Sequence, residues 1–291
     1  MRIYLAYISI VLLWATTPLA IKWSDEGAGF LFAVTGRMAI GLVCIFLMLG
    51  LSRQRLIWHR KALQTYLAVS VQIYGSMLAV YWAAQFIPSG WISVIFGLLP
   101  LMTALLAAIW LGERNLALGK LLAYILGISG LWALFGSAMQ LGHDAVLGIV
   151  GVLVSTFLQA ISTVWVKRID AKIPALSQVA GGLLLSLPVY LITWATFDGH
   201  WPTEISPIGL TSIIYLGAIA TTFGFVLYYY LLIHQSPSKV ALVTLVSPVM
   251  ALLLGHAVNH EPLTIKVVAG TLLILCALLA HTFSGRLNSS K

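Results

Sequence analysis

The chain consists of long, uninterrupted apolar runs joined by short polar connections. Each run is close to the roughly 20 residues that an α-helix needs to cross a hydrocarbon layer about 30 Å thick. Transmembrane barrel strands alternate apolar and polar residues instead, so a barrel is excluded. The pattern predicts an all-α integral membrane protein of ten transmembrane helices. These runs are residues 3–21, 30–50, 65–85, 91–111, 120–138, 147–166, 174–195, 209–232, 240–258 and 265–283.

The composition agrees with a surface that faces lipid. Hydrophobic residues make up 60% of the chain and charged residues only 8%, against about 25% charged in a typical soluble domain. Polar residues are too few to cover a soluble fold of 291 residues, so the lipid bilayer is the expected partner of most of the surface. A net charge of +8 would suggest nucleic acid in a soluble protein, but in a membrane protein we expect no nucleic-acid partner.

Two features near apolar runs have simple interpretations. Arg2 and the apolar stretch after it resemble a secretory signal, but the run from Ile3 to Ile21 is long for one and has a counterpart later in the chain. We therefore expect it to remain as the first helix. Cys44 and Cys276 each lie inside an apolar run without ligand partners, so no metal site and no cofactor is predicted.

The basic residues are distributed unevenly between the two ends of the predicted helices. Only Lys22 and Lys266 fall on one side, and Arg37 falls inside the second run. Because lysine and arginine accumulate on the cytoplasmic side, both termini are predicted to be cytoplasmic, in a multi-pass protein of the cell (inner) membrane. The thirteen residues on the other side are Arg2, Arg53, Arg55, Arg60, Lys61, Arg114, Lys120, Lys167, Arg168, Lys172, Lys239, Arg286 and Lys291.

The two halves of the chain resemble each other at a nearly fixed offset. Pro100 and Glu113 recur as Pro248 and Glu261, at an offset of 148 residues. Near the start the offset is 145, which places Gly36 opposite Gly181. Five spans per repeat is an odd number, so the second copy must be inserted upside down. Inverted repeats are typical of secondary transporters. The predicted units are residues 1–140 and 141–291.

Several short motifs resemble one transporter family. They are Leu13-Trp14 with Ile21-Lys22, then Gly36-Arg37, and Pro100 followed by Leu111-Gly112-Glu113 and Gly127. In this order they resemble the EamA-type members of the drug/metabolite transporter superfamily, over nearly the whole chain. The resemblance implies ten helices in two inverted five-helix repeats and export of small metabolites from the cytoplasm. It does not imply one substrate.

The second repeat departs from the family pattern at two places. His260-Glu261-Pro262 stands where the family usually has Gly-Glu, and Gly182 stands where the first half has Arg37. We interpret Glu113 and Glu261 as carboxylates that stabilise the positive ends of the helices after them; a proton-carrying role is the alternative.

Polar and aromatic side chains recur at helical spacing on six of the predicted spans. A shared central pocket for a small-molecule substrate would explain all six, although any one of these side chains could simply pack between helices. Pro100 and Pro248, near the middle of spans four and nine, are predicted to kink their helices toward that pocket. The candidate substrate-binding residues are Trp14, Tyr74, Tyr81, Phe96, Gln159, Thr163, Thr222, Tyr229 and Thr244.

Arg37 is a further candidate substrate-binding residue. It lies about 10 Å inside an apolar run, where a charged side chain costs at least about 2.5 kcal/mol and almost always faces a partner or a cavity. It could pair with backbone carbonyls or with Asp25 or Glu26, or it could bind a substrate carboxylate or phosphate.

The sequence therefore predicts a secondary or facilitative exporter of a small amphipathic metabolite, such as an amino acid or a drug-like compound, working by alternating access. The alternatives are an importer or exchanger of the same fold and a channel. An enzyme is not expected, because the eight acidic residues are dispersed rather than clustered at one depth. A monomer is the expected oligomeric state.

Overall fold

The structure is a computed structural model in which residues 2–112, 118–224, 227 and 237–289 are described. Within the described residues, the predicted apolar runs are mainly helical. The elements are α1 Arg2–Ser24, α2 Phe30–Leu51, α3 Arg60–Ser70, η1 Val71–Ser76, α4 Met77–Ala84, α5 Ser89–Phe96, α6 Leu99–Trp110, α7 Leu118–Leu141, α8 His143–Ile169, α9 Ala175–Phe197, α10 Pro207–Ile214, η2 Tyr215–Thr221, α12 Pro237–Asn259 and α13 Ile265–Ser289.

Several of these elements join end to end into single membrane spans. Within the described residues, nine helical segments are long and apolar enough to cross a membrane, among them Arg60–Ala84 from α3, η1 and α4. The predicted span that is not among these nine is the ninth, which corresponds to α12; its described stretch Leu245–Asn259 forms a shorter apolar helix. The predicted fold class is thus confirmed: the chain is an all-α membrane protein, and the nine spans and one shorter apolar helix of its described residues are close to the ten predicted.

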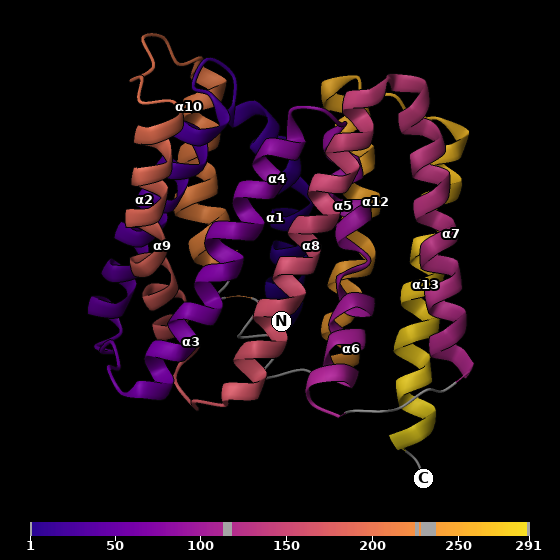
Figure 1. The fold of residues 1–291 in the computed structure, drawn as a ribbon, viewed down its shortest axis with the longest axis horizontal. Helices are drawn as coiled ribbons and strands as arrows, with labels where there is room; N and C mark the ends of the chain where they lie inside the picture. Colours follow the sequence, from indigo (N-terminus) through magenta and orange to yellow (C-terminus); the bar gives the residue numbers. More distant parts are fainter. Residues whose placement is uncertain (1, 113–117, 225–226, 228–236, 290–291) are drawn as a thin grey trace.

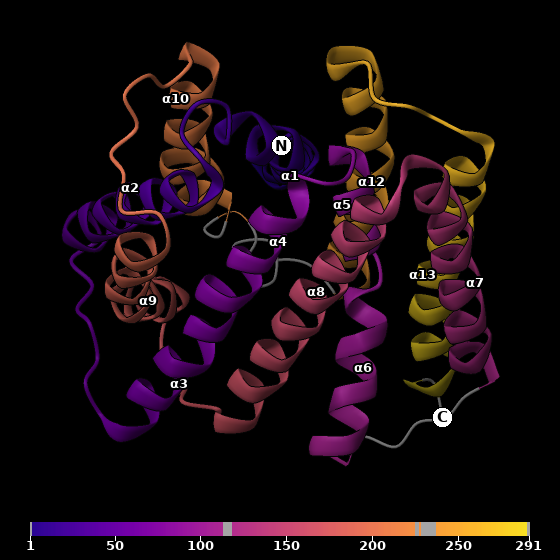
Figure 2. The same cartoon turned by 45° about the horizontal axis from the view of Figure 1, so that its top comes forward.

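Equivalent spans of the two halves pack against each other. The pairs are α2 with α9, α5 with α12, and α7 with α13, which are the second, fourth and fifth spans of each repeat. Figures 1 and 2 show α7 and α13 side by side at one edge of the bundle, with α5 and α12 toward its middle. The first span of each half crosses to the opposite half, because α1 packs on α12 and α8 packs on α6.

The α7–α13 pair is in close backbone contact at two glycines. A Cβ atom added at Gly130 would lie 2.7 Å from the carbonyl oxygen of Gly270, and one added at Gly270 would lie 2.8 Å from that of Gly130. Small residues permit such close approach between membrane helices. The two glycines therefore let the backbones of α7 and α13 meet directly.

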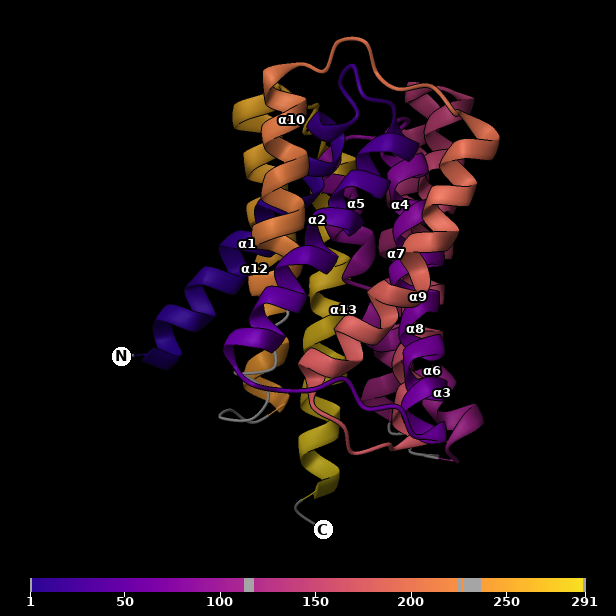
Figure 3. The ribbon, with the colours of Figure 1, turned by 90° about the vertical axis from the view of Figure 1, so that its left-hand side faces the viewer.

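The connections define two faces of the bundle. The α1–α2 and α9–α10 connections lie at the end opposite the C-terminus (Figure 3). We call this end the upper face. The main core of the bundle contains Val34, Tyr81, Trp91 and Tyr190, all almost fully buried.

Candidate functional site

Close packing between α2 and η2 sets the position of Arg37. A Cβ atom at Gly217 would lie 2.7 Å from Cβ of Ile40, and one at Gly41 would lie 3.2 Å from Cγ2 of Thr221. The missing side chains let the two backbones approach until the Arg37 side chain reaches across to η2.

Arg37 is buried in the interior of the bundle, with 6% of its surface exposed. Its Nε–H donates to Thr221 Oγ1 at 3.1 Å. Its guanidinium carbon lies 5.9 Å from the centroid of the Tyr81 ring, a geometry in which the π face attracts the cation. Among the described residues, Nη1 of Arg37 and the hydroxyl of Tyr81 are both buried without a hydrogen-bond partner.

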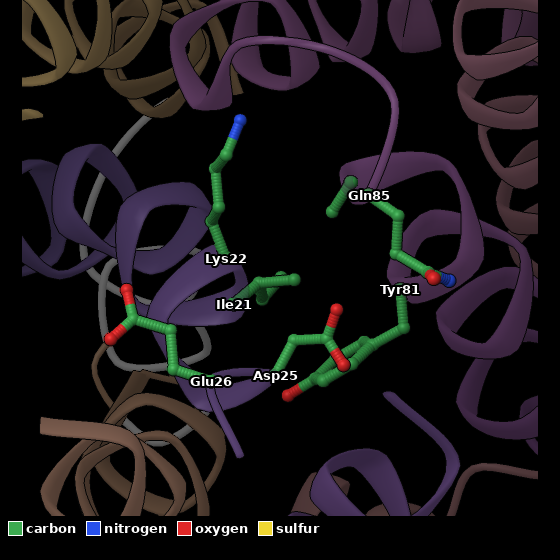
Figure 4. A pocket seen from close by; sticks show the side chains of 7 residues that line it. Ile21, Lys22, Asp25, Glu26, Tyr81 and Gln85 are labelled. Carbon is green, nitrogen blue, oxygen red and sulfur yellow. The ribbon is translucent and has the colours of Figure 1, made fainter. Parts of the chain in front are cut away.

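A cavity of about 230 Å³ opens beside Tyr81 at the upper face (Figure 4). Asp25 extends into it from the end of α1, and Tyr81 extends into it from α4 on the opposite side. Lys22 points to the α4–α5 connection, where its Nζ donates to the carbonyl of Ile87 at 3.0 Å. The lining residues are Ile21, Lys22, Asp25, Glu26, Tyr81, Ala84 and Gln85.

Two π-helical segments occupy corresponding places in the third and eighth spans. In η1 the hydroxyl of Tyr190 donates to the carbonyls of Ile73 at 2.7 Å and Tyr74 at 3.1 Å. In η2 the hydroxyl of Thr221 donates to the carbonyl of Leu216 at 2.8 Å, while also accepting from Arg37. Each π-helical segment is therefore held by a side chain from the second span of the opposite repeat. Such segments are frequent at functional sites.

The fourth span is broken rather than kinked at Pro100. Helix α5 ends at Phe96, and α6 begins at Leu99 with Pro100 in its first turn. Proline suits that position because it needs no hydrogen bond from its nitrogen there. In the ninth span, Pro248 lies within the continuous helix α12, so the two prolines have different local structures.

Glu261 caps the upper end of α5. Its Oε1 accepts from Ser89 N–H at 2.9 Å and from the Asn259 amide at 3.0 Å. Its Oε2 accepts from the Ser89 hydroxyl at 3.0 Å and from Gly90 N–H at 3.2 Å. The predicted capping role is correct, but the capped helix is wrong: it belongs to the other repeat and is not the helix that follows. Sequence order alone could not reveal a contact across 172 residues. Glu113 lies outside the described residues.

The other predicted site residues that are described do not line one shared pocket; they lie in several parts of the bundle. Tyr74 turns toward α9, where its hydroxyl lies 2.7 Å from that of Thr193. Thr222 is buried and donates to the carbonyl of Gly217 at 3.2 Å. Phe96 packs on the main core. Trp14 packs against a separate small core formed by Ala6, Ile10 and Val11 of α1.

The remaining predictions cannot all be placed. Thr163 is exposed and donates to the carbonyl of Gln159 at 2.8 Å. Tyr229 and the side chain of Thr244 lie outside the described part of the chain. Of the predicted set, the structure brings Arg37 and Tyr81 into direct contact, and Tyr81 lines the cavity.

Comparison with known proteins identifies the family. A model of the EamA-like transporter family matches residues 1–136 and 146–283. The chain belongs to this family. The EamA-like transporters are transporters rather than enzymes, and the recognition made from the sequence motifs is confirmed.

Individual relatives cover most of this EamA-like chain. It is 27% identical to the "Uncharacterized transporter YoaV" of Bacillus subtilis over 285 residues, 97% of each chain. It is 26% identical to a "Probable amino-acid metabolite efflux pump" of Salmonella typhimurium, over 73% of this chain and 74% of that one. It is 24% identical to a "Probable terminal-alkyne amino-acid exporter" of Streptantibioticus cattleyicolor, over 95% and 92%.

A solved structure shares the fold. The crystal structure of a protein superposes with a TM-score of 0.68 at 17% identity, over 98% of this chain and 99% of that one. At this identity the likeness concerns the fold alone.

Proposed function

We propose that this protein is a secondary or facilitative transporter that exports a small amphipathic metabolite, an amino acid or a similar compound, by alternating access. The observation that carries the proposal is the cavity at the upper face, which has Tyr81 on its wall and the buried guanidinium of Arg37 against the ring of that tyrosine. An aromatic face beside a cation suits a molecule with an apolar part and a charged group.

The interruptions of the spans support a moving carrier. The break between α5 and α6 and the π-helical segments η1 and η2 lie inside spans that are otherwise regular. Secondary transporters use discontinuous helices near their binding sites, and irregular helical segments can act as hinges. We propose Pro100, at the break, and Pro248, inside α12, as residues that shape the moving region.

The names of relatives support export of amino-acid-like molecules. Two of them are each named "Probable amino-acid metabolite efflux pump", and a third is named "Probable terminal-alkyne amino-acid exporter". The uneven distribution of basic residues supports a cell-membrane protein with both termini in the cytoplasm, so that the upper face is the outer one. We further propose that residues 1–140 and 141–291 are the two repeat units of a monomer.

The test is counterflow in proteoliposomes that contain the purified protein. Vesicles preloaded with an unlabelled aromatic amino acid should transiently accumulate the labelled compound, and uptake should saturate. Stronger inhibition by a polyamine or a sugar phosphate than by the amino acid would contradict the proposed cargo. Flux without saturation or counterflow would indicate a channel instead.

Direction needs a separate measurement in cells. Cells that overproduce the protein should resist an added toxic amino acid and should retain less of it when preloaded. Greater sensitivity and faster accumulation would indicate an importer.

A further inference from the structure

Arg37 is a buried cation whose charge has no anionic partner in the described protein. Its Nε–H has a partner in Thr221, but that hydroxyl is neutral. Among the described residues no carboxylate lies within ion-pair distance of the guanidinium, and Nη1 makes no hydrogen bond. Buried charges in proteins are paired or are bound to a ligand. An anion bound beside Arg37 would supply the counter-charge and the hydrogen-bond acceptor that the described residues do not provide.

A purely structural role does not account for these contacts. The residues that could have neutralised Arg37 from nearby are Asp25 and Glu26, and both lie on the cavity without an ion pair to it. The second repeat has no cation at the position equivalent to Arg37, which is Gly182. There, a Cβ atom at Gly182 would already lie 2.5 Å from Cγ1 of Val69. Packing thus excludes an arginine at Gly182, and at Arg37 the contact with Thr221 holds η2 without neutralising the charge.

Tyr81 connects this unpaired cation to the cavity. Its ring contacts the guanidinium, it lines the cavity, and its buried hydroxyl has no partner among the described residues. A phenol hydroxyl and a guanidinium N–H are both donors that suit one carboxylate. Two unused donors on adjacent side chains indicate where that carboxylate binds.

Asp25 provides the opposite charge on the same cavity. It follows the last residue of α1 and extends into the cavity across from Tyr81 (Figure 4). Its carboxylate has no hydrogen bond or ion pair in the described structure, and burial raises its pKa. An ammonium group placed there would provide the missing counter-charge.

We propose that the cavity binds a zwitterion, with the carboxylate of the cargo at Arg37 and Tyr81 and its ammonium group at Asp25. This inference rests on the proposed transport function and names the charge pattern of its cargo. One guanidinium matches one carboxylate, whereas a doubly charged phosphate would need a second cation. Lys22 lies on the same cavity, but its side chain points away from Tyr81 and Asp25 toward the α4–α5 connection, where it donates to the Ile87 carbonyl (Figure 4).

The experiment removes each charge of the cargo and each charge of the protein in turn. The probes are L-phenylalanine, its methyl ester, which lacks the carboxylate, and N-acetyl-L-phenylalanine, which lacks the ammonium. The variants are Arg37→Gln, Asp25→Asn and Tyr81→Phe, with Lys61→Gln and Glu204→Gln as exposed controls. Two readouts are recorded: stabilisation of the detergent-solubilised protein against heating, and inhibition of counterflow.

The wild-type protein should prefer L-phenylalanine to either derivative by roughly ten- to a hundred-fold, as expected for charge-assisted hydrogen bonds. Arg37→Gln should lose the discrimination against the methyl ester and keep that against the N-acetyl compound. Asp25→Asn should show the reverse pattern. Tyr81→Phe should weaken the discrimination against the ester in part, and the two controls should match the wild type.

Several results would overturn the assignment. One is a wild-type protein that binds all three probes equally, or none of them, and yet transports another metabolite. The zwitterion site would then be refuted, and the proposed export function would be retained. Another is identical loss of both discriminations in Arg37→Gln and Asp25→Asn. Stabilisation by chloride alone, with no effect of the probes, would show that Arg37 binds an inorganic anion. Binding of the zwitterion without counterflow would refute the transport function and retain the site.

If Arg37→Gln does not fold, Arg37→Lys provides the same test. It retains the charge but loses the planar pair of donors, so the preference over the methyl ester should be reduced and not abolished. An unchanged preference in a folded Arg37→Lys protein would contradict carboxylate recognition by the guanidinium.

Discussion

Asp25 gives the cavity a carboxylate whose protonation depends on its burial. Desolvation raises its pKa above the ordinary value of 3.8, and the other titratable side chains on the cavity are Lys22, Glu26 and Tyr81. As the pH falls through this raised pKa, Asp25 becomes neutral and loses its attraction for an ammonium group. We predict weaker binding of an amino acid on acidification, and no such dependence in Asp25→Asn.

The same shift makes a prediction about stability. Because the folded protein holds this proton more tightly than the unfolded chain, stability falls as the pH rises from 3.8 to the raised pKa. The unfolding temperature of the wild type, relative to Asp25→Asn, should therefore decrease across that interval and then stay constant. A wild-type protein that gains stability over Asp25→Asn as the pH rises would show that Asp25 is paired when charged.

Individual residues show what can be predicted from the sequence at this scale. A lone arginine within an apolar run is visible without a structure, because its burial is so unfavourable. That its neighbour is Tyr81, and that Asp25 remains apart from it, depends on how α1, α2 and α4 pack. Those contacts join residues far apart in the chain, and helical spacing carries no information about them.

At the scale of elements, Glu261 links the two repeats through one helix end. Glu261→Ala would leave the N–H groups of Ser89 and Gly90 and the amide of Asn259 without their acceptor. We predict a loss of about 1–3 kcal/mol in the free energy of unfolding, measured by denaturation in detergent. Glu261→Gln should lose less, because it keeps one acceptor oxygen, and the exposed Glu204→Ala should lose nothing measurable. Equal stability of Glu261→Ala and wild type would contradict the capping role.

The break in the fourth span leads to a different prediction. Alanine at Pro100 restores a backbone N–H, so the segment between α5 and α6 could become continuous helix. The double variant Pro100→Ala, Pro248→Ala should insert and remain folded but transport more slowly. Counterflow rate at equal protein content is the measurement. A normal rate would show that the two prolines serve packing only.

Elements were predictable where the signal is local. Apolar runs and their flanking charges locate the spans, because each helix must satisfy its own backbone in lipid. The π-helical segments η1 and η2 were not predictable, since they depend on Tyr190 and Arg37 reaching across from other spans. A proline in the middle of a span likewise predicts an irregular helix at that point. Whether the helix breaks, as at Pro100, or continues, as at Pro248, depends on the neighbouring helices, so it could not be predicted from the sequence.

At the scale of the whole molecule, the two repeats share one architecture and differ in chemistry. The π-helical segments η1 and η2 and the packing of α2 on α9 and α5 on α12 follow the symmetry. Arg37 and the tightly packed Gly182 break it. A symmetric carrier would present the same charge to both faces, whereas a single buried cation nearer one end of its span makes the two faces unequal.

The inverted arrangement also fixes which connections share a side of the membrane, and this gives a prediction about orientation. The connection with Arg53, Arg55, Arg60 and Lys61 should be cytoplasmic, because the membrane potential and anionic lipids retain basic loops on that side. The α9–α10 connection lies at the opposite end (Figure 3). After replacement of Cys44 and Cys276 by serine, a single cysteine at Thr203 should react with an impermeant maleimide added to intact cells. A single cysteine at Gln54 should react only after the membrane is permeabilised. The reverse labelling pattern would show that the protein has the opposite orientation in the membrane. The cavity would then face the cytoplasm, where an exporter takes up its cargo instead of releasing it.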